Sequence, residues 1–438
     1  MRILSRFISI MAMAFLAIGF PVRAGEPVGS VIALRAARMW DGISEVCVTD
    51  AVVVIEGDRI RSAGSRIAIP DGARVIDLGL ATILPGLLDA HTHLFLDEDA
   101  RLNPLGLDIL SPIVQLGTSS RALRGTRIAR EYLTAGITTV RDLGNVGIGG
   151  DIALRDAIRD GWVQGPSMQV ATRAISGPRG QFARLAPEHK SLAADEYAVI
   201  DDAASAVRAV RHAVSDGADL IKVILDPTFA PEDLRAIVAE AHRLKRKVAA
   251  HATSEVEVLM AAECGADSIE HGTQGVPDEA IRLMAAKGIT YVPTIASHRL
   301  AQALFVEAQG LTGEAAKAEA VEDAKWLASM GDAIRRARKA GVRIVLGSDI
   351  YHRIPGISRG EAALEVLVGL GEAGLRPVEA LRAATSDSAE LMGITASTGQ
   401  IKAGFTANLL VVEGNPLKNL EDIRRTKLVV VRGDIWAR

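Results

Sequence analysis

The sequence contains very little cysteine: its 438 residues include only Cys47 and Cys264, which lie far apart in the chain. The two form no Cys-x-x-Cys pair, so neither a disulfide framework nor a metal site built from thiolates is supported. Aromatic residues make up only 4% of the chain, whereas hydrophobic residues together make up 49%. We therefore expect a core of Ala, Val, Ile and Leu, because branched aliphatic side chains fill the interior of a packed barrel.

Neither positive nor negative charge is in marked excess. The chain has 50 lysines and arginines against 53 aspartates and glutamates, a formal net charge of -3, and it has no basic run. Proteins that bind nucleic acid need clustered positive charge to replace the counterions of the phosphates. Nucleic acid is therefore not an expected partner.

Long hydrophobic runs are missing except near the start of the chain. There, Arg2 and Arg6 precede an apolar run from Ile8 to Phe20, and Val22-Arg23-Ala24 follows it. The run is too short to span a bilayer comfortably, and the pattern is typical of a cleaved signal peptide, with a membrane-anchoring helix as the alternative. We expect residues 1–24 to be removed. The mature protein would then be periplasmic or secreted, without a membrane attachment.

After this segment, hydrophobic residues are arranged in two different patterns along the chain. Residues 25–80 contain short β-rich pieces separated by Asp-Gly and Gly turns, which predicts the first part of a small β domain. From residue 81, apolar runs alternate with segments that are mostly long enough for helices. Eight runs are strand candidates: "ATILPGLLDAHTH", "GITTVRDLG", "SMQVATRAIS", "DLIKVIL", "KVAAHAT", "DSIEHGT", "ITYVPTIAS" and "VRIVLGSDI". This alternation predicts an α/β fold, a (β/α)8 TIM barrel whose active site lies where the strands end.

One intervening helix is explicit in the pattern. In "PEDLRAIVAEAHRLKRK", acidic residues open the segment and basic residues close it, as the helix dipole favours. Five apolar residues fall on one stripe at helical spacing, namely Leu234, Ile237, Val238, Ala241 and Leu244. The segment is therefore predicted to be a helix with one apolar stripe.

Polar residues gather at the predicted ends of the strands. Four of the nine histidines, one lysine and one aspartate lie within or near the ends of strands one, four, five, six and eight: His91, His93, Lys222, His251, His271 and Asp349. The ends of barrel strands meet at one face of the fold. A scattered structural role would not concentrate these residues there, so they form the candidate site.

His91 and His93 are separated by a single residue. Alternate side chains of a strand point to the same face, so the two rings can bind one metal ion together. Taken alone, the pair allows another interpretation, in which one histidine is a satisfied core residue and the other lies on the surface. The other residues of the site favour the metal.

Lys222 is the most unusual residue of the set, because "DLIKVIL" places an ammonium group inside an aliphatic strand. An unpaired buried charge is costly, and burial lowers the pKa of a lysine and frees its amine as a nucleophile. A buried ion pair, for example with Asp349, is one interpretation. The other is that the neutral amine captures carbon dioxide and becomes a carbamate, which can bridge two cations. Four histidines and a carboxylate around it form a ligand set that suits zinc.

With these residues in place, the sequence resembles the amidohydrolase superfamily. "PGLLDAHTHL" is similar to its HxH motif, "GADLIKV" to its carboxylated-lysine strand, "AHAT" and "SIEHGT" to its two single-histidine strands, and "LGSDI" to its strand-eight aspartate. The likeness is greatest to the imidazolonepropionase-like and prolidase-like branch, which includes Xaa-Pro and Xaa-Arg dipeptidases, N-acyl amino acid hydrolases and ochratoxin amidohydrolases. The tail resembles the segment that returns to the β domain. This implies a barrel over residues 81–390 and a β-sandwich closed by residues 391–438.

The resemblance also implies roles for the six residues. His91, His93 and Asp349 would hold a more buried metal ion, His251 and His271 a more exposed one, and carboxylated Lys222 would bridge the two. Two such ions share a water molecule and generate a hydroxide directed at a carbonyl group. Asp349 would take the proton and pass it to the leaving amine. Relatives of this kind also imply a homo-oligomer.

The substrate must be inferred from the loops. Arg179, His298, Tyr351 and His352 follow strands three, seven and eight, at the same face as the metal ligands. Arg179 can pair with a substrate carboxylate, although it can also be a surface arginine. Tyr351 or His352 can orient the substrate, or cap the loop that follows. Many relatives carry a Gly-Gly-His loop where this chain has Gly177-Pro178-Arg179-Gly180, which weakens inference of the substrate by analogy.

The sequence therefore predicts an exported binuclear metal hydrolase, with two divalent ions, best matched by zinc, and carbon dioxide or bicarbonate for Lys222. Its substrate would be a small amide, namely a dipeptide or an N-acyl amino acid, including amides of the ochratoxin type. One alternative is a hydrolase of cyclic amides or lactones at the same site. A mononuclear deaminase would not need Lys222. An alternative of another class is a catalytically silent barrel that serves as a binding protein.

Overall fold

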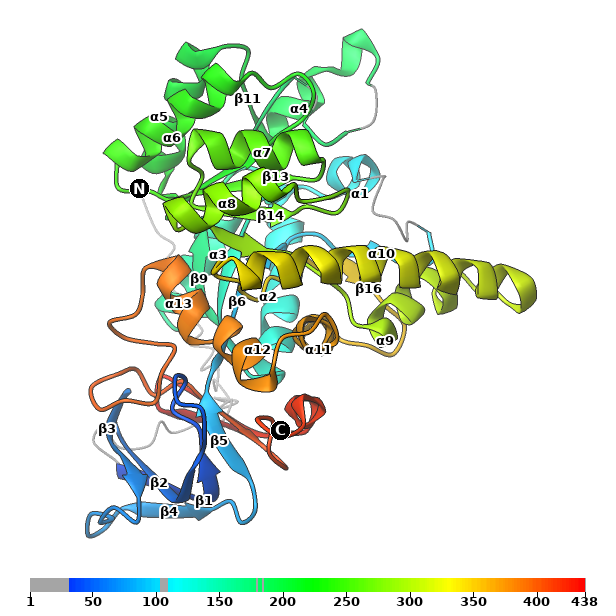
Figure 1. Cartoon of the computed structure of the whole chain (residues 1–438). Helices are drawn as coiled ribbons and strands as arrows, with labels where there is room; N and C mark the ends of the chain where they lie inside the picture. Colours follow the sequence, from blue (N-terminus) through cyan, green and yellow to red (C-terminus); the bar gives the residue numbers. More distant parts are fainter. Residues whose placement is uncertain (1–30, 103–108, 179, 183–184, 438) are drawn as a thin grey trace, which may run out of the picture.

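The computed structural model describes residues 31–102, 109–178, 180–182 and 185–437. The expected signal segment, residues 1–24, lies outside the described residues. Figure 1 shows a barrel surrounded by helices and, beneath it, a smaller sheet to which both ends of the described chain contribute. The α/β barrel and the additional sheet that the sequence predicts are both present.

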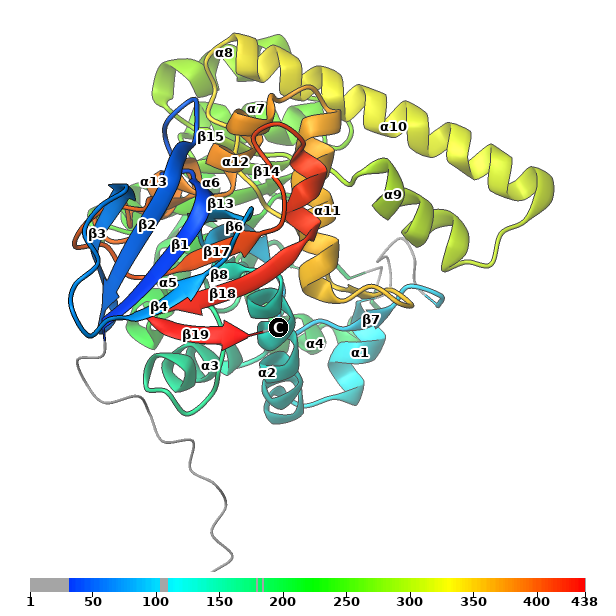
Figure 2. The ribbon, with the colours of Figure 1, turned by 90° about the horizontal axis from the view of Figure 1, so that it is seen from below.

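The smaller sheet joins strands from the two ends of the chain, and Figure 2 shows them side by side. Its strand order is β19-β18-β17-β5-β1-β2-β3, and β4 pairs with β1. The bounds are β1 Val31–Met39, β2 Val48–Glu56, β3 Arg59–Ser65, β4 Arg74–Asp77, β5 Thr82–Pro85, β17 Leu409–Val412, β18 Thr426–Val431 and β19 Asp434–Ala437. Alternate residues of these strands, such as Leu34, Val53 and Val411, form one apolar cluster, which holds the strands from the two ends of the chain together.

Gly86 divides what the sequence predicts as a single first strand. Residues up to Pro85 belong to the smaller sheet, where Leu84 is paired with Leu410, and the barrel strand β6 runs over Leu87–Thr92. A side chain at Gly86 would meet the Thr138 hydroxyl oxygen at 2.3 Å. The close approach of Gly86 to Thr138 therefore requires glycine where the chain passes from the smaller sheet to the barrel.

The remaining strands of the barrel are parallel. They are β8 Ile137–Asp142, β9 Ser167–Val170, β12 Ile221–Ile224, β13 Val248–Ala252, β14 Ser268–His271 and β15 Thr290–Val292. The eighth predicted segment is bridged to β15 through Tyr291 and Ile344, and Leu346 accepts a backbone hydrogen bond of 2.8 Å from Ala90 of β6. This irregular segment closes the barrel. Two short strands, β10 Ile175–Ser176 and β11 Ala198–Val199, extend the sheet beside β12.

Helices cover the barrel and connect its strands. The longer ones are α2 Thr118–Thr134, α3 Gly150–Arg159, α5 Ala203–Asp216, α6 Pro231–Arg243, α7 Glu255–Cys264, α8 Asp278–Lys287, α10 Gly313–Lys339 and α11 Arg359–Glu372. Within α6, the predicted apolar stripe is buried from Leu234 to Ala241, and Leu244 lies at the C-terminal end. Ser254 and Glu257 start α7 with reciprocal side-chain caps.

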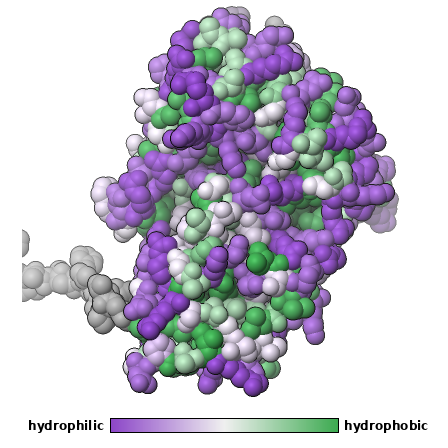
Figure 3. All heavy atoms as spheres, turned by 60° about the vertical axis from the view of Figure 1, so that its left-hand side comes forward, coloured by the Kyte–Doolittle hydropathy of each residue, from purple (hydrophilic) through white to green (hydrophobic). Residues whose placement is uncertain are grey.

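Shorter elements surround the mouth of the barrel and the junction with the sheet. They are β7 Glu98–Asp99, α1 Leu110–Gln115, η1 Pro187–His189, α4 Ser191–Glu196, α9 His298–Ala301, η2 Gln302–Glu307, β16 His352–Arg353, α12 Pro377–Ala383, α13 Ser386–Met392 and η3 Leu420–Arg424. Figure 3 shows a face on which hydrophilic side chains dominate and hydrophobic ones are scattered between them. Among the described residues, no helix has the length and apolar character needed to cross a membrane.

Candidate active site

A cavity of about 220 Å³ opens at the ends of the barrel strands. Five of the six metal ligands expected from the sequence line this cavity. The sixth, His91, is fully buried. The lining residues are His93, Leu96, Ile109, Leu143, Asn145, Gln181, Lys222, Ile224, His251, His271, Asp349 and Tyr351. The barrel thus brings together residues that are more than 250 positions apart in sequence, from His91 to Asp349.

His91, His93 and Asp349 form the closest group in the cavity. The Nε2 atoms of the two histidines are 3.3 Å apart, and they lie 3.5 Å and 3.3 Å from Oδ1 of Asp349. His91 is the next-to-last residue of β6, whereas Asp349 lies near the end of the eighth segment. The backbone N–H of Asp349 donates to the carbonyl of His91 over 2.8 Å. Asp349 has a φ of 52°, a left-handed conformation that is uncommon for residues other than glycine and often marks functional sites.

The opposite ring nitrogens of the two histidines are held by oxygen atoms. Nδ1 of His91 lies 2.8 Å from Oε2 of Glu270, and Nδ1 of His93 lies 3.0 Å from the backbone carbonyl of Gly144. Both oxygens accept hydrogen bonds, so each Nδ1 carries the ring hydrogen when the ring is neutral. Both Nε2 atoms then direct lone pairs at each other and at Asp349. This cluster of acceptors is consistent with a cation at its centre.

Lys222 is buried, with 3% of its surface exposed, and its amine has no hydrogen-bond partner. The buried ion pair with Asp349, one interpretation of the sequence, is not formed. Burial lowers the pKa of Lys222 to about 8, mainly by removing the ammonium group from water. A partly neutral, unpartnered amine is the chemical state that a reaction with carbon dioxide requires.

His251 and His271 lie on neighbouring strands, and their ring centroids are 4.4 Å apart. Nδ1 of His271 is 3.0 Å from the Thr294 hydroxyl oxygen and 3.5 Å from Oδ2 of Asp349. Its Nε2 is buried without a partner. One ligand atom each from His91, His271 and Asp349 lies within 4.8 Å of the others. The unpartnered nitrogens and the mixed set of N and O donors fit a divalent metal ion.

Burial also sets the protonation of the histidines. It lowers the pKa of His251 to about 3 and the pKa values of His91 and His271 well below the usual value. His93 differs, because the hydrogen bond and charge of Asp349 outweigh burial and raise its pKa. Burial alone would raise the pKa of Asp349, but the adjacent His91 and His93 lower it. The site therefore holds the neutral imidazoles of His91, His251 and His271 beside an ionised carboxylate, which is the state that metal ligation requires of these groups.

The four residues expected to contact substrate have different surroundings. Tyr351 lines the cavity, and its ring centroid is 6.2 Å from that of His93. His352 is buried against Tyr351, with ring centroids 4.4 Å apart, and does not line the cavity. His298 lies on α9 with 67% of its side chain exposed, and its ring pairs with Glu372 outside the cavity. Arg179 lies outside the described residues.

The sequence analysis missed Glu270 and Arg141, which lie beneath the metal-binding group. Glu270 is fully buried and accepts hydrogen bonds from Arg141 and from the Ser268 hydroxyl, at 2.8 Å and 2.5 Å. Arg141 also donates to the carbonyl of Ala90 over 2.5 Å. Charged residues inside apolar strands, as in "TTVRD" and "SIEH", are the signal that points to such a network. Asn145 and Gln181, on the loops after β8 and β10, were missed because loop residues carry no periodic pattern.

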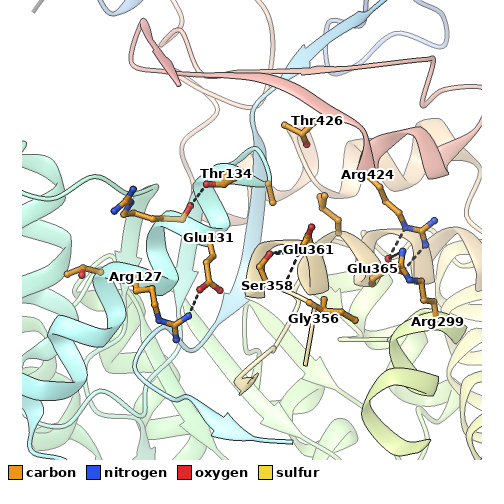
Figure 4. Close-up of a pocket in the computed structure, with 15 residues that line it drawn as sticks. Arg127, Glu131, Thr134, Arg299, Gly356, Ser358, Glu361, Glu365, Arg424 and Thr426 are labelled. Atoms are coloured by element: carbon orange, nitrogen blue, oxygen red, sulfur yellow. Dashed lines mark hydrogen bonds and ion pairs between the residues drawn. The ribbon is translucent and has the colours of Figure 1, made fainter. Parts of the chain in front are cut away.

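A larger cavity of about 570 Å³ lies elsewhere, between α2, α11 and the segment that enters β18. Figure 4 shows that several of its charged side chains face a partner of opposite charge. Arg424 binds Glu365 through two hydrogen bonds of 2.8 Å and 2.7 Å, Arg299 lies 3.2 Å from the same carboxylate, and Arg127 pairs with Glu131. None of the six expected metal ligands lines it. Its size alone therefore does not make it the active site.

Comparisons with known proteins agree with the geometry. Ochratoxinase of Aspergillus niger is 32% identical over 416 residues, which cover 87% of this chain and 81% of that protein. Imidazolonepropionase of Deinococcus radiodurans is 25% identical over 395 residues, covering 84% of this chain and 86% of that protein. The solved structure of a Xaa-Pro dipeptidase with bound methionine in its active site is 27% identical, with a TM-score of 0.77, and covers 93% of this chain and 100% of that one.

These relatives confirm the branch that the sequence motifs resemble. The match to the family extends over residues 82–436, from the strand that enters the barrel to the last strand of the smaller sheet. The chain belongs to the amidohydrolase family and is a hydrolase that acts on amide bonds.

Proposed function

We propose that this protein is an exported binuclear metal hydrolase that cleaves the amide bond of a dipeptide or an N-acyl amino acid. The observation that carries the proposal is the unpartnered amine of Lys222 beside the group formed by His91, His93 and Asp349. A structural core would pair or exclude a buried amine. A site that carboxylates the lysine and binds two cations gives the amine a function.

Six residues would hold the two ions. His91, His93 and Asp349 would bind one, His251 and His271 the other, and the carboxylated Lys222 would bridge them. Zinc suits this set of imidazole and carboxylate ligands. When bound, divalent ions in such a site lower the pKa of water and polarise the carbonyl group of an amide.

The residues of the chain would then orient the substrate and move the proton. Asp349 is ionised and would accept a proton from the attacking water and deliver it to the nitrogen of the leaving amine, which cannot depart unprotonated. Burial raises the pKa of Tyr351, so its phenol keeps its hydrogen and can donate to an oxygen of the substrate. Leu96, Ile109, Leu143 and Ile224 supply an apolar wall for the acyl part.

The names of the relatives support this choice of substrate. One structure of similar fold is described as a prolidase complexed with N-methylphosphonate-L-proline, at 27% identity and a TM-score of 0.76. Its ligand contains proline, and the Xaa-Pro dipeptidase binds methionine, so both structures hold an amino acid or a derivative of one. We extend that class of ligand to this chain.

Metal analysis combined with a substrate library tests the proposal. Protein produced with bicarbonate should hold about two ions per chain and hydrolyse members of a library of dipeptides and N-acyl amino acids. Lys222→Ala should lower metal content and activity together, and a small carboxylic acid that fits the gap should restore part of both. His298→Ala, outside the cavity, is the matched control and should change neither.

Two results would contradict the proposal. Saturation of the unmodified protein at one ion with high activity would exclude the binuclear site. Absence of both metal and turnover across the library would favour a binding protein instead. Turnover confined to ring-closed amides or lactones would assign the same site to the alternative substrate class.

The proposal includes export and self-association. Sequencing of the mature protein from its native host should find the N-terminus at or near Gly25, and recovery of intact Met1 protein from the cell envelope would contradict this. We also expect a homo-oligomer, which light scattering of the purified protein measures directly.

A further inference from the structure

Asn145 is a polar residue of the cavity that belongs to none of the expected metal ligands. It follows β8 in the sequence Leu143-Gly144-Asn145, in which Leu143 also lines the cavity and the carbonyl of Gly144 holds Nδ1 of His93. Only one peptide unit therefore separates the support of a metal-binding ring from the Asn145 side chain. Asn145 is 5% exposed, so this position is close to the reacting centre and largely shielded from water.

The backbone of Asn145 is held in an uncommon conformation. Its φ is 61°, in the left-handed region, and its carbonyl accepts a hydrogen bond from Arg121. Arg121 is itself fixed by two hydrogen bonds of 2.9 Å to Glu196, and both side chains are almost completely buried. A left-handed residue held by a buried ion pair beside a cavity indicates a position that the fold maintains for function.

The side chain of Asn145 is held by Tyr197, the residue that follows Glu196 in the sequence. Its Nδ2 donates a hydrogen bond of 3.1 Å to the hydroxyl of Tyr197, which directly follows Glu196 at the end of α4. Gln181, which stands between Gly180 and Phe182, also lines the cavity. Tyr197 thus connects two loops that line the site, and its ring packs directly against Gly180 and Phe182.

With Nδ2 bound to Tyr197, the amide oxygen of Asn145 is left to accept a hydrogen bond from the contents of the cavity. We propose that Asn145 determines specificity by accepting a hydrogen bond from the N–H of the scissile amide, with Tyr197 as the residue that positions it. This inference rests on the proposed amide hydrolysis. The substrate class becomes narrower: secondary amides, whose nitrogen carries a hydrogen, are preferred to tertiary amides such as the Xaa-Pro bond, whose nitrogen is fully substituted.

The contact would act on the step in which the amine leaves. A hydrogen bond from the N–H group fixes the orientation of the amide nitrogen, so that its developing lone pair can face the acid that protonates it. The benefit should therefore appear mainly in kcat, because the orientation matters most as the nitrogen changes its geometry. A residue that merely supports the loop would affect all substrates alike.

A matched pair of substrates tests the inference on the metal-loaded, full-length protein. The pair is an N-acyl alanine and the same compound with a methyl group on the scissile nitrogen. Asn145→Gly is the decisive variant, because glycine adopts the φ of 61° without strain while removing the amide. We expect its kcat with the N–H substrate to fall roughly tenfold, the loss expected for one hydrogen bond, and its kcat with the N-methyl substrate to stay the same.

Tyr197→Phe provides a second, independent variant, since it removes only the hydroxyl group. It should reproduce the selective loss with the N–H substrate to a smaller extent, with unchanged metal content. Phe182→Leu disturbs the same packing without altering a hydrogen bond, so it should affect the two substrates equally. Equal losses on both substrates in Asn145→Gly and Tyr197→Phe, or no loss on either, would overturn the inference. Failure of the wild type to cleave any amide would instead reject the proposed function.

Discussion

The two cavities of this protein differ in how their polar groups are satisfied. The larger one, about 570 Å³, is lined by arginines and glutamates that mostly bind each other, although the Thr426 hydroxyl is buried without a partner. The smaller one, about 220 Å³, contains an unpartnered lysine amine, an unpartnered imidazole nitrogen and two facing Nε2 atoms. Polar groups left unsatisfied by the fold indicate a missing ligand, whereas a paired network is complete by itself. Unmet bonding capacity, rather than volume, identifies the active site.

The largest effect should follow from a carboxylate of the smaller cavity. Asp349→Asn keeps the shape and one oxygen ligand but removes the base, so much of the metal should remain while kcat falls by roughly 10² to 10⁴. Elemental analysis and steady-state kinetics measure the two quantities. Glu361→Gln makes the same chemical change in the larger cavity and should leave kcat within about twofold of wild type. Near-normal turnover of metal-loaded Asp349→Asn would show that Asp349 does not transfer the proton.

Glu270→Gln should have the next largest effect, and on metal affinity more than on chemistry. Glu270 orients His91 by accepting from its Nδ1, and Arg141 balances the buried charge. The amide weakens this orientation and leaves Arg141 without a carboxylate, so metal affinity should fall by roughly 10- to 100-fold. Titration of metal-free protein with a competing chelator gives the value. Unchanged affinity would show that His91 is oriented by the backbone alone.

Glu270 also shows where sequence reasoning ends. His91, His93 and Lys222 could be assigned because alternation along a strand fixes the face on which a side chain lies. The same rule places the neighbours Glu270 and His271 on opposite faces. In the structure both reach the site, because His271 has a φ of 79° and leaves the regular strand geometry. The positions of the eight barrel segments were predictable from the alternation of apolar runs with segments long enough for helices. The break at Gly86 and the loop residue Asn145 depend on close approaches that only the assembled fold reveals.

The unpaired amine of Lys222, in the smaller cavity, predicts that the recovery of activity by metal-free protein depends on pH. Its folded pKa of about 8 lies below the usual lysine value, and only the neutral amine can attack carbon dioxide. Below pH 8 the neutral fraction of the amine falls about tenfold per unit. At a fixed concentration of dissolved carbon dioxide, recovery of activity by metal-free protein should therefore slow in proportion, and it should level off above pH 8. Recovery rates measured on both sides of pH 8 test this. A rate independent of pH would contradict carboxylation through the free amine.

The smallest effect on turnover should come from Arg424 in the larger cavity. Arg424→Ala removes two hydrogen bonds to Glu365, but Glu365 keeps Ser297 at 2.8 Å and Arg299 at 3.2 Å, so its charge stays partnered. The expected loss of unfolding free energy is therefore about 1 kcal/mol, well below the loss for an orphaned buried charge. Thermal unfolding should show a small decrease in Tm, while kcat stays within about twofold of wild type. Arg130→Ala removes an arginine of the same cavity without an ion pair among the described residues, and should change Tm less. A large loss of turnover in Arg424→Ala would mean that the paired cavity also serves the reaction, and the contrast between the two cavities would have to be abandoned.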